Sequence, residues 1–219
     1  MSVHLRPEEI EAESFRLIDA EVGPHPWPPA EWAVVRRAIH TSADFDYARS
    51  MVFSAGAVAG GVAALRAGRG IVTDTTMALA GIAKPRLALF GIRTSCFVAD
   101  PAVARAAREA GVTRSILAMR TGAADPANGI FVIGNAPTAL FELLRLIREE
   151  GVRPGLIVGL PVGFVGAAES KEALLALERE RPEIPFITNR GRKGGSTVAA
   201  AVINALLLLA AETTTNVRD

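Results

Sequence analysis

The sequence predicts an α/β fold, a three-layer α/β/α sandwich with a mainly parallel sheet of about five strands. Short, wholly apolar runs recur along the chain, as strands buried on both faces do, and segments with helical spacing alternate with them. Crossovers between parallel strands are nearly always right-handed, which places helices on both faces of the sheet. Half of the 219 residues are hydrophobic, and no linker or break in composition divides them. Residues 1–219 are therefore expected to form a single domain.

Two helices are expected before the first strand. Apolar residues at helical spacing predict an amphipathic helix over residues 6–21. The proline-rich segment 23–29 ends this helix, because proline lacks a donor and restricts the residue before it. A second helix then runs through Ile39 and delivers His40 at its end.

The rest of the chain alternates between strands and helices. Strands are expected at residues 70–74, 87–91, 129–134, 156–160 and 185–188. Helices are expected at residues 54–67, around Met77 and Leu79, and at 101–110, 137–150, 170–180 and 198–212. The polar residues after Glu212 are expected to form a frayed tail.

Charge and cysteine content exclude several classes of protein. The 24 basic and 23 acidic residues nearly cancel, which gives no reason to expect a nucleic-acid surface, so anion recognition depends on locally placed groups. Cys96 is the single cysteine, so no intrachain disulfide forms, and a small core residue is the favoured interpretation over a nucleophile. With no CxxC and three histidines, no zinc or iron–sulfur site is expected.

The hydropathy pattern predicts a cytoplasmic protein without a membrane segment. The first 20 residues are charged and lack the apolar centre of a signal peptide. The most apolar segment, residues 198–211, is shorter than the roughly 20 residues that cross a bilayer, and Asn204 interrupts it. This segment is expected to be a buried helix.

Residues 39–46 place an imidazole close to two carboxylates. His40 can exchange protons near neutral pH, because an unperturbed imidazole titrates around pH ~6.5, and Asp44 and Asp46 follow it closely. A structural histidine with satisfied hydrogen bonds is the alternative. The segment alone does not decide between them.

Ligands of open parallel sheets bind beyond the carboxyl ends of the strands, which makes the loops there candidates. The loop at residues 189–197 combines Arg190, Arg192 and Lys193 with glycines and a helix start, a pattern that favours an anion. A solvated basic turn with a helix cap is the alternative. Neither a Walker motif nor GxGxxG is present, so nucleotide binding is unsupported.

Two further loops have functional and structural interpretations. Asn135 either binds a polar part of a ligand or lies near the cap of a helix that Pro137 begins. The apolar, glycine-rich segment 159–166 permits close approach by a large flat ligand or tight packing between layers. Apolar walls, scattered cations and one proton-transfer candidate suit a large polycarboxylate ring better than a nucleotide.

Several longer runs then identify a resemblance. The sequence resembles the precorrin-8X methylmutase (precorrin isomerase) family, which also has a cobalt-precorrin-8 form, over roughly residues 14–209. The runs that carry the resemblance are Ser14-Phe15, Ile39-His40, Ala80-Gly81-Ile82, Thr113-Arg114-Ser115, residues 134–141, residues 161–171 and residues 190–196.

This resemblance implies a reaction. A methyl group would move from C-11 to C-12 of the corrinoid macrocycle by a suprafacial [1,5]-sigmatropic shift, giving hydrogenobyrinate, or cobyrinate when cobalt is present. No cofactor is implied, and cobalt enters only as part of the substrate. The family's histidine matches His40, whose implied role is proton donation to the ring, a contribution worth ~10²–10⁴-fold. The family forms homodimers with sites near the subunit interface.

The resemblance and the loop positions together give a set of substrate-binding candidates. Ser14 and Arg114 match family positions near the ligand, and Thr41 follows the matched histidine. The candidates assigned from loop position, as recipients of propionate and acetate carboxylates, are Asn135, Thr138, Arg192 and Lys193.

Two departures and one alternative accompany this assignment. Residues 41–46 resemble the cobalt-precorrin-8 branch more than the metal-free branch. Glu11 and Glu13 stand on the first helix where more ring-friendly neighbours are expected. A corrinoid-binding or carrier protein without catalysis is the alternative function, and it would have no need of a titrating His40.

Overall fold

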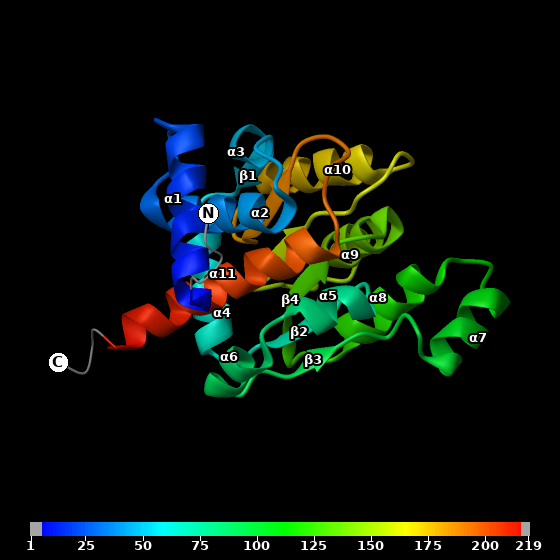
Figure 1. Ribbon diagram of the computed structural model, residues 1–219. Helices are drawn as coiled ribbons and strands as arrows, with labels where there is room; N and C mark the ends of the chain where they lie inside the picture. Colours follow the sequence, from blue (N-terminus) through cyan, green and yellow to red (C-terminus); the bar gives the residue numbers. More distant parts are fainter. Residues whose placement is uncertain (1–5, 216–219) are drawn as a thin grey trace.

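The computed structural model describes residues 6–215, and within them six strands form one sheet in the order β1-β6-β5-β4-β2-β3 (Figure 1). Strands β6, β5, β4, β2 and β3 run parallel, while β1 pairs antiparallel with β6 through Val52 and Thr188. The predicted α/β class with a mainly parallel sheet is confirmed.

The strands and helices alternate along most of the chain. The strands are β1 (Met51–Phe53), β2 (Gly70–Thr73), β3 (Thr94–Ser95), β4 (Asn128–Ile133), β5 (Leu156–Gly159) and β6 (Phe186–Asn189). The helices of the first half are α1 (Pro7–Val22), α2 (Pro29–Ser42), α3 (Tyr47–Ser50), α4 (Ala57–Arg66), α5 (Thr76–Gly81) and α6 (Lys84–Leu89). Those of the second half are α7 (Pro101–Glu109), α8 (Arg114–Ala124), α9 (Pro137–Glu149), α10 (Ala167–Glu180) and α11 (Ser196–Thr215).

Two apolar cores cover the two faces of the sheet. Successive side chains of a strand point to opposite faces, so Val132 joins the core beneath α2, α4 and α11, while Phe131 joins the core beneath α8, α9 and α10. Because both faces are buried, the strands read as continuous apolar runs rather than alternating ones. The three-layer arrangement therefore follows directly from the runs seen in the sequence.

Helix α11 runs across one face of the sheet and is apolar on nearly all sides (Figure 1). Asn204, which interrupts its apolar run, bonds to the α5–α6 connection: its Oδ1 accepts from Ala83 N at 2.9 Å and its Nδ2 donates to Gly81 O at 2.9 Å. No helix within residues 6–215 has the length and hydropathy to cross a membrane. Helix α11 continues to Thr215, three residues past the predicted start of the tail, and residues 216–219 lie outside the described part.

The strand predicted at residues 87–91 is wrong. This stretch belongs largely to helix α6, which has Pro85 in its first turn and buries Leu87 while exposing Leu89. Proline in the first turn favours a helix, and a single buried face is sufficient for so short an element. The fold places the short strand β3 after this helix instead.

Strands β1 and β3 and helix α8 were not predicted. The two strands are too short, at three and two residues, for an alternation pattern to be visible. Helix α8 begins after Thr113, whose hydroxyl accepts a hydrogen bond from Ile116 N at 3.4 Å, as an N-cap residue does. Helices α7 and α8 lie at the end of the molecule opposite α1 (Figure 1).

Candidate active site

The carboxyl ends of β2 and β4 are joined by one buried carboxylate. Asp74, which follows β2 and is 2% exposed, accepts three backbone hydrogen bonds: Oδ1 from Gly134 N at 2.9 Å, and Oδ2 from Asn135 N at 2.8 Å and Ala136 N at 2.7 Å. Burial raises the pKa of Asp74 above its usual range, although the three amide hydrogen bonds act in the opposite direction. Asp74 therefore fixes the loop that leads into α9.

The start of α11 packs against the same edge of the sheet. Ser196 and Thr75 share a hydrogen bond between their hydroxyl oxygens at 2.7 Å. Gly194 has to be glycine, since a Cβ there would collide with the carbonyl oxygen of Leu160, and Gly195 N donates to that oxygen at 2.9 Å. The loops after β2, β5 and β6 thus form one connected surface at the carboxyl ends of the strands.

The loop between β6 and α11, residues 190–195, carries three exposed cations in different surroundings, and we call it the basic loop. Arg190 pairs with Glu172 at 3.0 Å. Lys193 bridges Asp44 at 2.6 Å and Asp46 at 2.5 Å. Arg192 has no carboxylate partner among residues 6–215, and its guanidinium lies 5.6 Å from the ring centroid of Phe164. Among these three cations it is therefore the one without a carboxylate partner in the described part of the chain.

The bridge made by Lys193 links the basic loop to the segment after His40. Hydrogen bonds with Asp44 and Asp46 raise the pKa of Lys193, and the same ammonium lowers the pKa of Asp44. A second link is made by Tyr47, whose hydroxyl donates to Gly194 O at 3.5 Å. Burial raises the pKa of Tyr47 to about 12, so its phenol is protonated at neutral pH.

His40 lies in the last turn of α2 and is half-buried. Its imidazole meets the ring of Phe15 edge to face, with centroids 5.3 Å apart and planes at 68°. Helix α2 ends at Ser42 and is followed by Ala43, which has a left-handed backbone; Asp44 N then donates to Ser42 Oγ at 3.2 Å. The edge contact with Phe15 places the imidazole against α1, while the segment that follows His40 reaches the basic loop through Asp44 and Asp46.

Helix α1 supplies Phe15 together with Ser14. The hydroxyl of Ser14 donates to Ile10 O at 2.8 Å, a bond back to a carbonyl of its own helix. The two acids noted on this helix are engaged by arginines, Glu11 by Arg37 at 2.8 Å and Glu13 by Arg16 at 2.6 Å.

The remaining predicted ligand-binding residues lie on three elements: Arg114 at the start of α8, Asn135 and Thr138 between β4 and the first turn of α9, and Thr41 in the last turn of α2. Thr113 Oγ1 donates to Thr138 Oγ1 at 3.2 Å, so the start of α8, with the exposed Arg114, adjoins the start of α9. Asn135 is exposed just before α9, and Thr41 is exposed next to His40 in the sequence. The roles of all these residues stay predictions.

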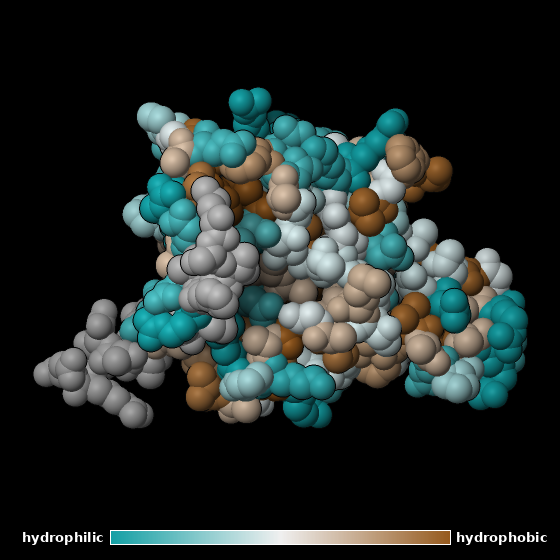
Figure 2. Space-filling view, in the orientation of Figure 1, coloured by the Kyte–Doolittle hydropathy of each residue, from teal (hydrophilic) through white to brown (hydrophobic). Residues whose placement is uncertain are grey.

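An exposed apolar surface accompanies the cations. Phe164 and Val165 are 84% and 90% exposed, and Val162 and Phe141 are exposed nearby. Gly166 lies against Pro137 and Phe141, which joins the apolar loop after β5 to the first turn of α9. In the space-filling view, pale and brown residues cover much of the face over α5 and the start of α11, and teal side chains gather around it (Figure 2).

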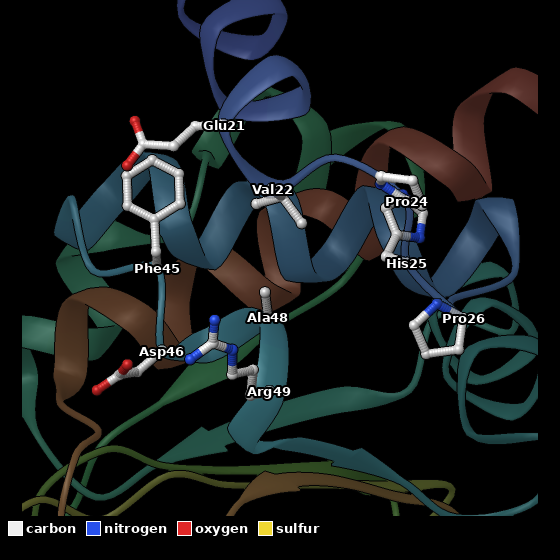
Figure 3. A pocket seen from close by; sticks show the side chains of 9 residues that line it. All are labelled: Glu21, Val22, Pro24, His25, Pro26, Phe45, Asp46, Ala48 and Arg49. Atoms are coloured by element: carbon white, nitrogen blue, oxygen red, sulfur yellow. The ribbon is translucent and has the colours of Figure 1, made fainter.

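A separate cavity of about 390 Å³ lies between the α1–α2 connection and α3 (Figure 3). Its charged lining residues are Glu21, Asp46 and Arg49, and His25 also lines it, stacked on Trp32 at 4.0 Å between ring centroids. His40 does not line this cavity, and acids and bases are mixed in it without a dominant charge. We therefore place the candidate active site at the strand ends and not here.

No cluster of three or more histidine, cysteine or acidic side chains suited to a metal ion occurs within residues 6–215. Cys96 is half-buried and unpaired. That the reaction uses no cofactor remains a prediction.

Two buried charged residues at the strand ends, Asp74 and Lys171, were not among the predicted site residues. Asp74 stood in a candidate loop, but the sequence does not tell that its carboxylate turns inward. Lys171 is fully buried on α10, and its signal was available: it falls on the same helical face as the buried Ala167 and Leu174, where a charge is unusual.

These features define an α/β protein whose candidate site lies at the carboxyl ends of the strands, where an exposed arginine stands beside an exposed apolar loop. The sequence matches the family model for precorrin-8X methylmutase over residues 9–209. The chain belongs to this family, as the resemblance implied.

Individual relatives agree with the family match. The chain is 47% identical to cobalt-precorrin-8 methylmutase of Priestia megaterium, covering 92% of this chain and 87% of that protein. It is 48% identical to the protein of the same name from Leptospira interrogans, covering 90% of each. A crystal structure of precorrin-8X methylmutase from Thermus thermophilus superposes with a TM-score of 0.85 at 44% identity, covering 94% of this chain and 97% of that one. The predictions of a methylmutase, an isomerase, and of a role in cobalamin biosynthesis are confirmed.

Proposed function

We propose that this protein moves a methyl group from C-11 to C-12 of precorrin-8X or cobalt-precorrin-8, giving hydrogenobyrinate or cobyrinate. The observation that carries this proposal is the strand-end surface, where the unpaired Arg192 lies beside the exposed apolar loop containing Phe164, and the basic loop is tied to the segment after His40. A corrinoid macrocycle combines a broad apolar ring with peripheral carboxylates, and this surface offers a complementary partner for each.

His40 is the proton donor in this proposal. A protonated imidazole can give its proton to the ring system and select the reactive tautomer. The imidazole is half-buried and meets Phe15 edge to face, a contact that favours the orientation seen here. Restricted orientation lowers the cost of reaching the reactive geometry.

The peripheral carboxylates of the ring are assigned to polar groups along the strand-end surface. Arg192 and Arg114 are exposed, and neither has a carboxylate partner among residues 6–215. Lys193 directs two ammonium hydrogens to Asp44 and Asp46, which leaves one for a ligand. The remaining assigned binding residues, which could donate hydrogen bonds to the same carboxylates, are Ser14, Thr41, Asn135 and Thr138.

The partners and conditions of the reaction follow from the same proposal. We infer that no cofactor is consumed, that cobalt enters only as part of the substrate, and that the protein works as a cytoplasmic homodimer. The exposed apolar loop at Phe164 and Val165 supports a large ligand, a subunit contact or both. The cobalt form is favoured as substrate, because the relatives at 47% and 48% identity carry the name cobalt-precorrin-8 methylmutase.

The test is anaerobic incubation of the purified protein with precorrin-8X and, separately, with its cobalt complex, followed by absorption spectroscopy. Wild type is expected to convert at least one of them, and the faster substrate identifies the branch. The variant His40→Asn is expected to lose at least about 100-fold in kcat while it still binds product, since general acid catalysis is worth that much. His25→Asn is the matched control and should keep full activity.

The carrier alternative makes a different prediction for the same samples. If wild type binds both ligands tightly and converts neither, or if His40→Asn turns over at the wild-type rate, the proton-donor mechanism is wrong.

A further inference from the structure

The basic loop is anchored from inside the protein by a buried lysine. Lys171 on α10 is 0% exposed, and its Nζ donates to Lys193 O at 2.6 Å and to Asn189 Oδ1 at 3.1 Å. Asn189 in turn donates through Nδ2 to Lys193 O at 3.0 Å and to Arg190 O at 3.2 Å. The backbone of the basic loop is therefore held at Arg190 and Lys193 by one small hydrogen-bond network.

This lysine has an unusual electrostatic position. Its two partners are neutral oxygens, and no carboxylate pairs with it among residues 6–215. Glu172, the next residue, is engaged outward by Arg190 of the basic loop at 3.0 Å. Burying an ammonium without an anion costs free energy, so a hydrophobic residue would serve packing better at this position.

The anchor determines where Arg192 stands. With Lys193 O and Arg190 O turned inward to the network, the three cationic side chains of the loop are all exposed. The carbonyl oxygen of Arg192 accepts from Gly163 N at 3.2 Å, which fixes the loop against the apolar segment that carries Phe164. The anchor and this bond together leave the guanidinium above that segment.

We propose that Lys171 is a positioning residue of the active site, which orders the basic loop through Lys193 O and Asn189 so that Arg192 meets a carboxylate of the ligand. The identity of the ligand in this inference rests on the proposed function. The ordering of the loop rests on the hydrogen bonds of Lys171 and Asn189 alone. Its positive charge, close behind the loop and unpaired, adds to the attraction for an anionic ligand.

Protonation of Lys171 offers a readout that a merely structural residue would not give. Burial lowers the pKa of Lys171 to about 8, so the ammonium loses its proton as pH rises through that value. The charged groups around it are Glu172 on α10 and Arg190 and Lys193 on the loop, with Asp44, Asp46 and Tyr47 beyond Lys193. Of these, the pKa of Tyr47 lies at about 12, well above the range tested.

The first experiment measures affinity for hydrogenobyrinate by absorption titration between pH 6.5 and 9.5, a range chosen around a pKa of about 8. Wild-type affinity is expected to fall as pH rises through that value. Lys171→Met is expected to bind about tenfold to a hundredfold more weakly at pH 7 and to lack this decline. In steady-state kinetics Lys171→Met should have a higher KM than wild type and a similar kcat, because contacts with the loop are made equally in the ground state and the transition state. The exposed lysine variant Lys84→Met is the control and should match wild type.

A second variant keeps the inference testable if Lys171→Met fails to fold. Asn189→Asp places a carboxylate against the Lys171 ammonium, which raises the pKa of that ammonium. The fall in affinity is then expected at a higher pH than in wild type. A decline at unchanged pH in Asn189→Asp, or unchanged affinity in Lys171→Met, would overturn the assignment.

Hydrogen exchange separates this inference from the proposed function. Without ligand, the backbone amides of residues 190–195 should exchange faster in Lys171→Met than in wild type, and equal exchange would refute the ordering role. If wild type neither binds nor converts a corrinoid, the proposed function falls and Arg192 loses its ligand. The exchange rates would still decide whether Lys171 orders the loop.

Discussion

Two loops at the carboxyl edge of the sheet are held by buried charges of opposite sign. The loop after β4 is fixed by Asp74, whose carboxylate accepts from three backbone N–H groups. The basic loop after β6 is fixed by Lys171, whose ammonium donates to a carbonyl oxygen and an amide oxygen. Neither charge has a side-chain counter-ion among the described residues.

The difference decides which loop can receive an anion. Asp74 consumes the N–H groups of Gly134, Asn135 and Ala136, so that loop offers a ligand little beyond the exposed side chain of Asn135. Lys171 consumes oxygens instead, and the basic loop presents its cationic side chains outward. A buried cation behind a loop therefore suits anion binding, whereas a buried anion suits rigid backbone.

The largest expected effect on stability comes from replacing the Asp74 carboxylate, which accepts three backbone hydrogen bonds. Asp74→Asn should lower the free energy of unfolding by about 2–4 kcal/mol, because an amide turns a donor toward backbone N–H groups that need an acceptor. Chemical denaturation at pH 7 measures this loss. Asp125→Asn is the control. It affects an exposed bond from Ala127 N and an exposed ion pair with Arg93 at 3.6 Å, and it should cost under about 1 kcal/mol. Equal losses in the two variants would show that the hydrogen bonds to Asp74 contribute little to stability.

A second effect should appear in the pH dependence of stability. The pKa of Lys171 is lowered to about 8 in the folded protein, so between that pH and its ordinary value of 10.5 the unfolded chain binds more protons. The contribution of this group to stability is therefore fully present above pH 10.5 and is lost as pH falls toward 8. The thermal stability of wild type relative to Lys171→Met should therefore increase as pH rises from about 8 to 10.5, and thermal unfolding of both proteins across this range measures it.

Asp74 should show the same dependence with the opposite sign. Burial raises its pKa, so its contribution to stability is present below the ordinary value and is lost as pH rises through the raised value. The difference between wild type and Asp74→Asn should therefore shrink as pH rises from the acid side. A difference that grows instead would mean that the amide bonds outweigh burial.

The smallest expected effect belongs to the exposed end of the basic loop. Lys193→Met removes the bridge to Asp44 and Asp46, yet stability should change by no more than about 1 kcal/mol, because the pair lies in solvent. Chemical denaturation at low and high salt measures this change, and the difference in free energy of unfolding between wild type and Lys193→Met should become smaller as the salt concentration rises. A loss as large as that of Asp74→Asn would mean that the bridge is a main support of the loop.

Sequence patterns predicted the layers of the fold well and its short elements poorly. Apolar runs such as the one ending at Ile133 are buried on both faces, and that burial is visible in composition. The prediction of a strand at residues 87–91 was wrong, because a short apolar stretch is compatible with a helix or a strand. Pro85 in the first turn favours the helix. Strands of two or three residues, β1 and β3, leave no pattern to read.

The sequence by itself determined the α/β class, the family and the identities of the candidate groups, because apolar periodicity and long matched runs are local properties of the chain. Tertiary structure decided which charges are free. Arg190, Arg192 and Lys193 are equivalent cations in the sequence, and only the packing of α10 and the segment after α2 engages two of them and leaves Arg192. The inward turn of Lys171 was decided in the same way, because burial of a charge depends on neighbours that are distant along the chain.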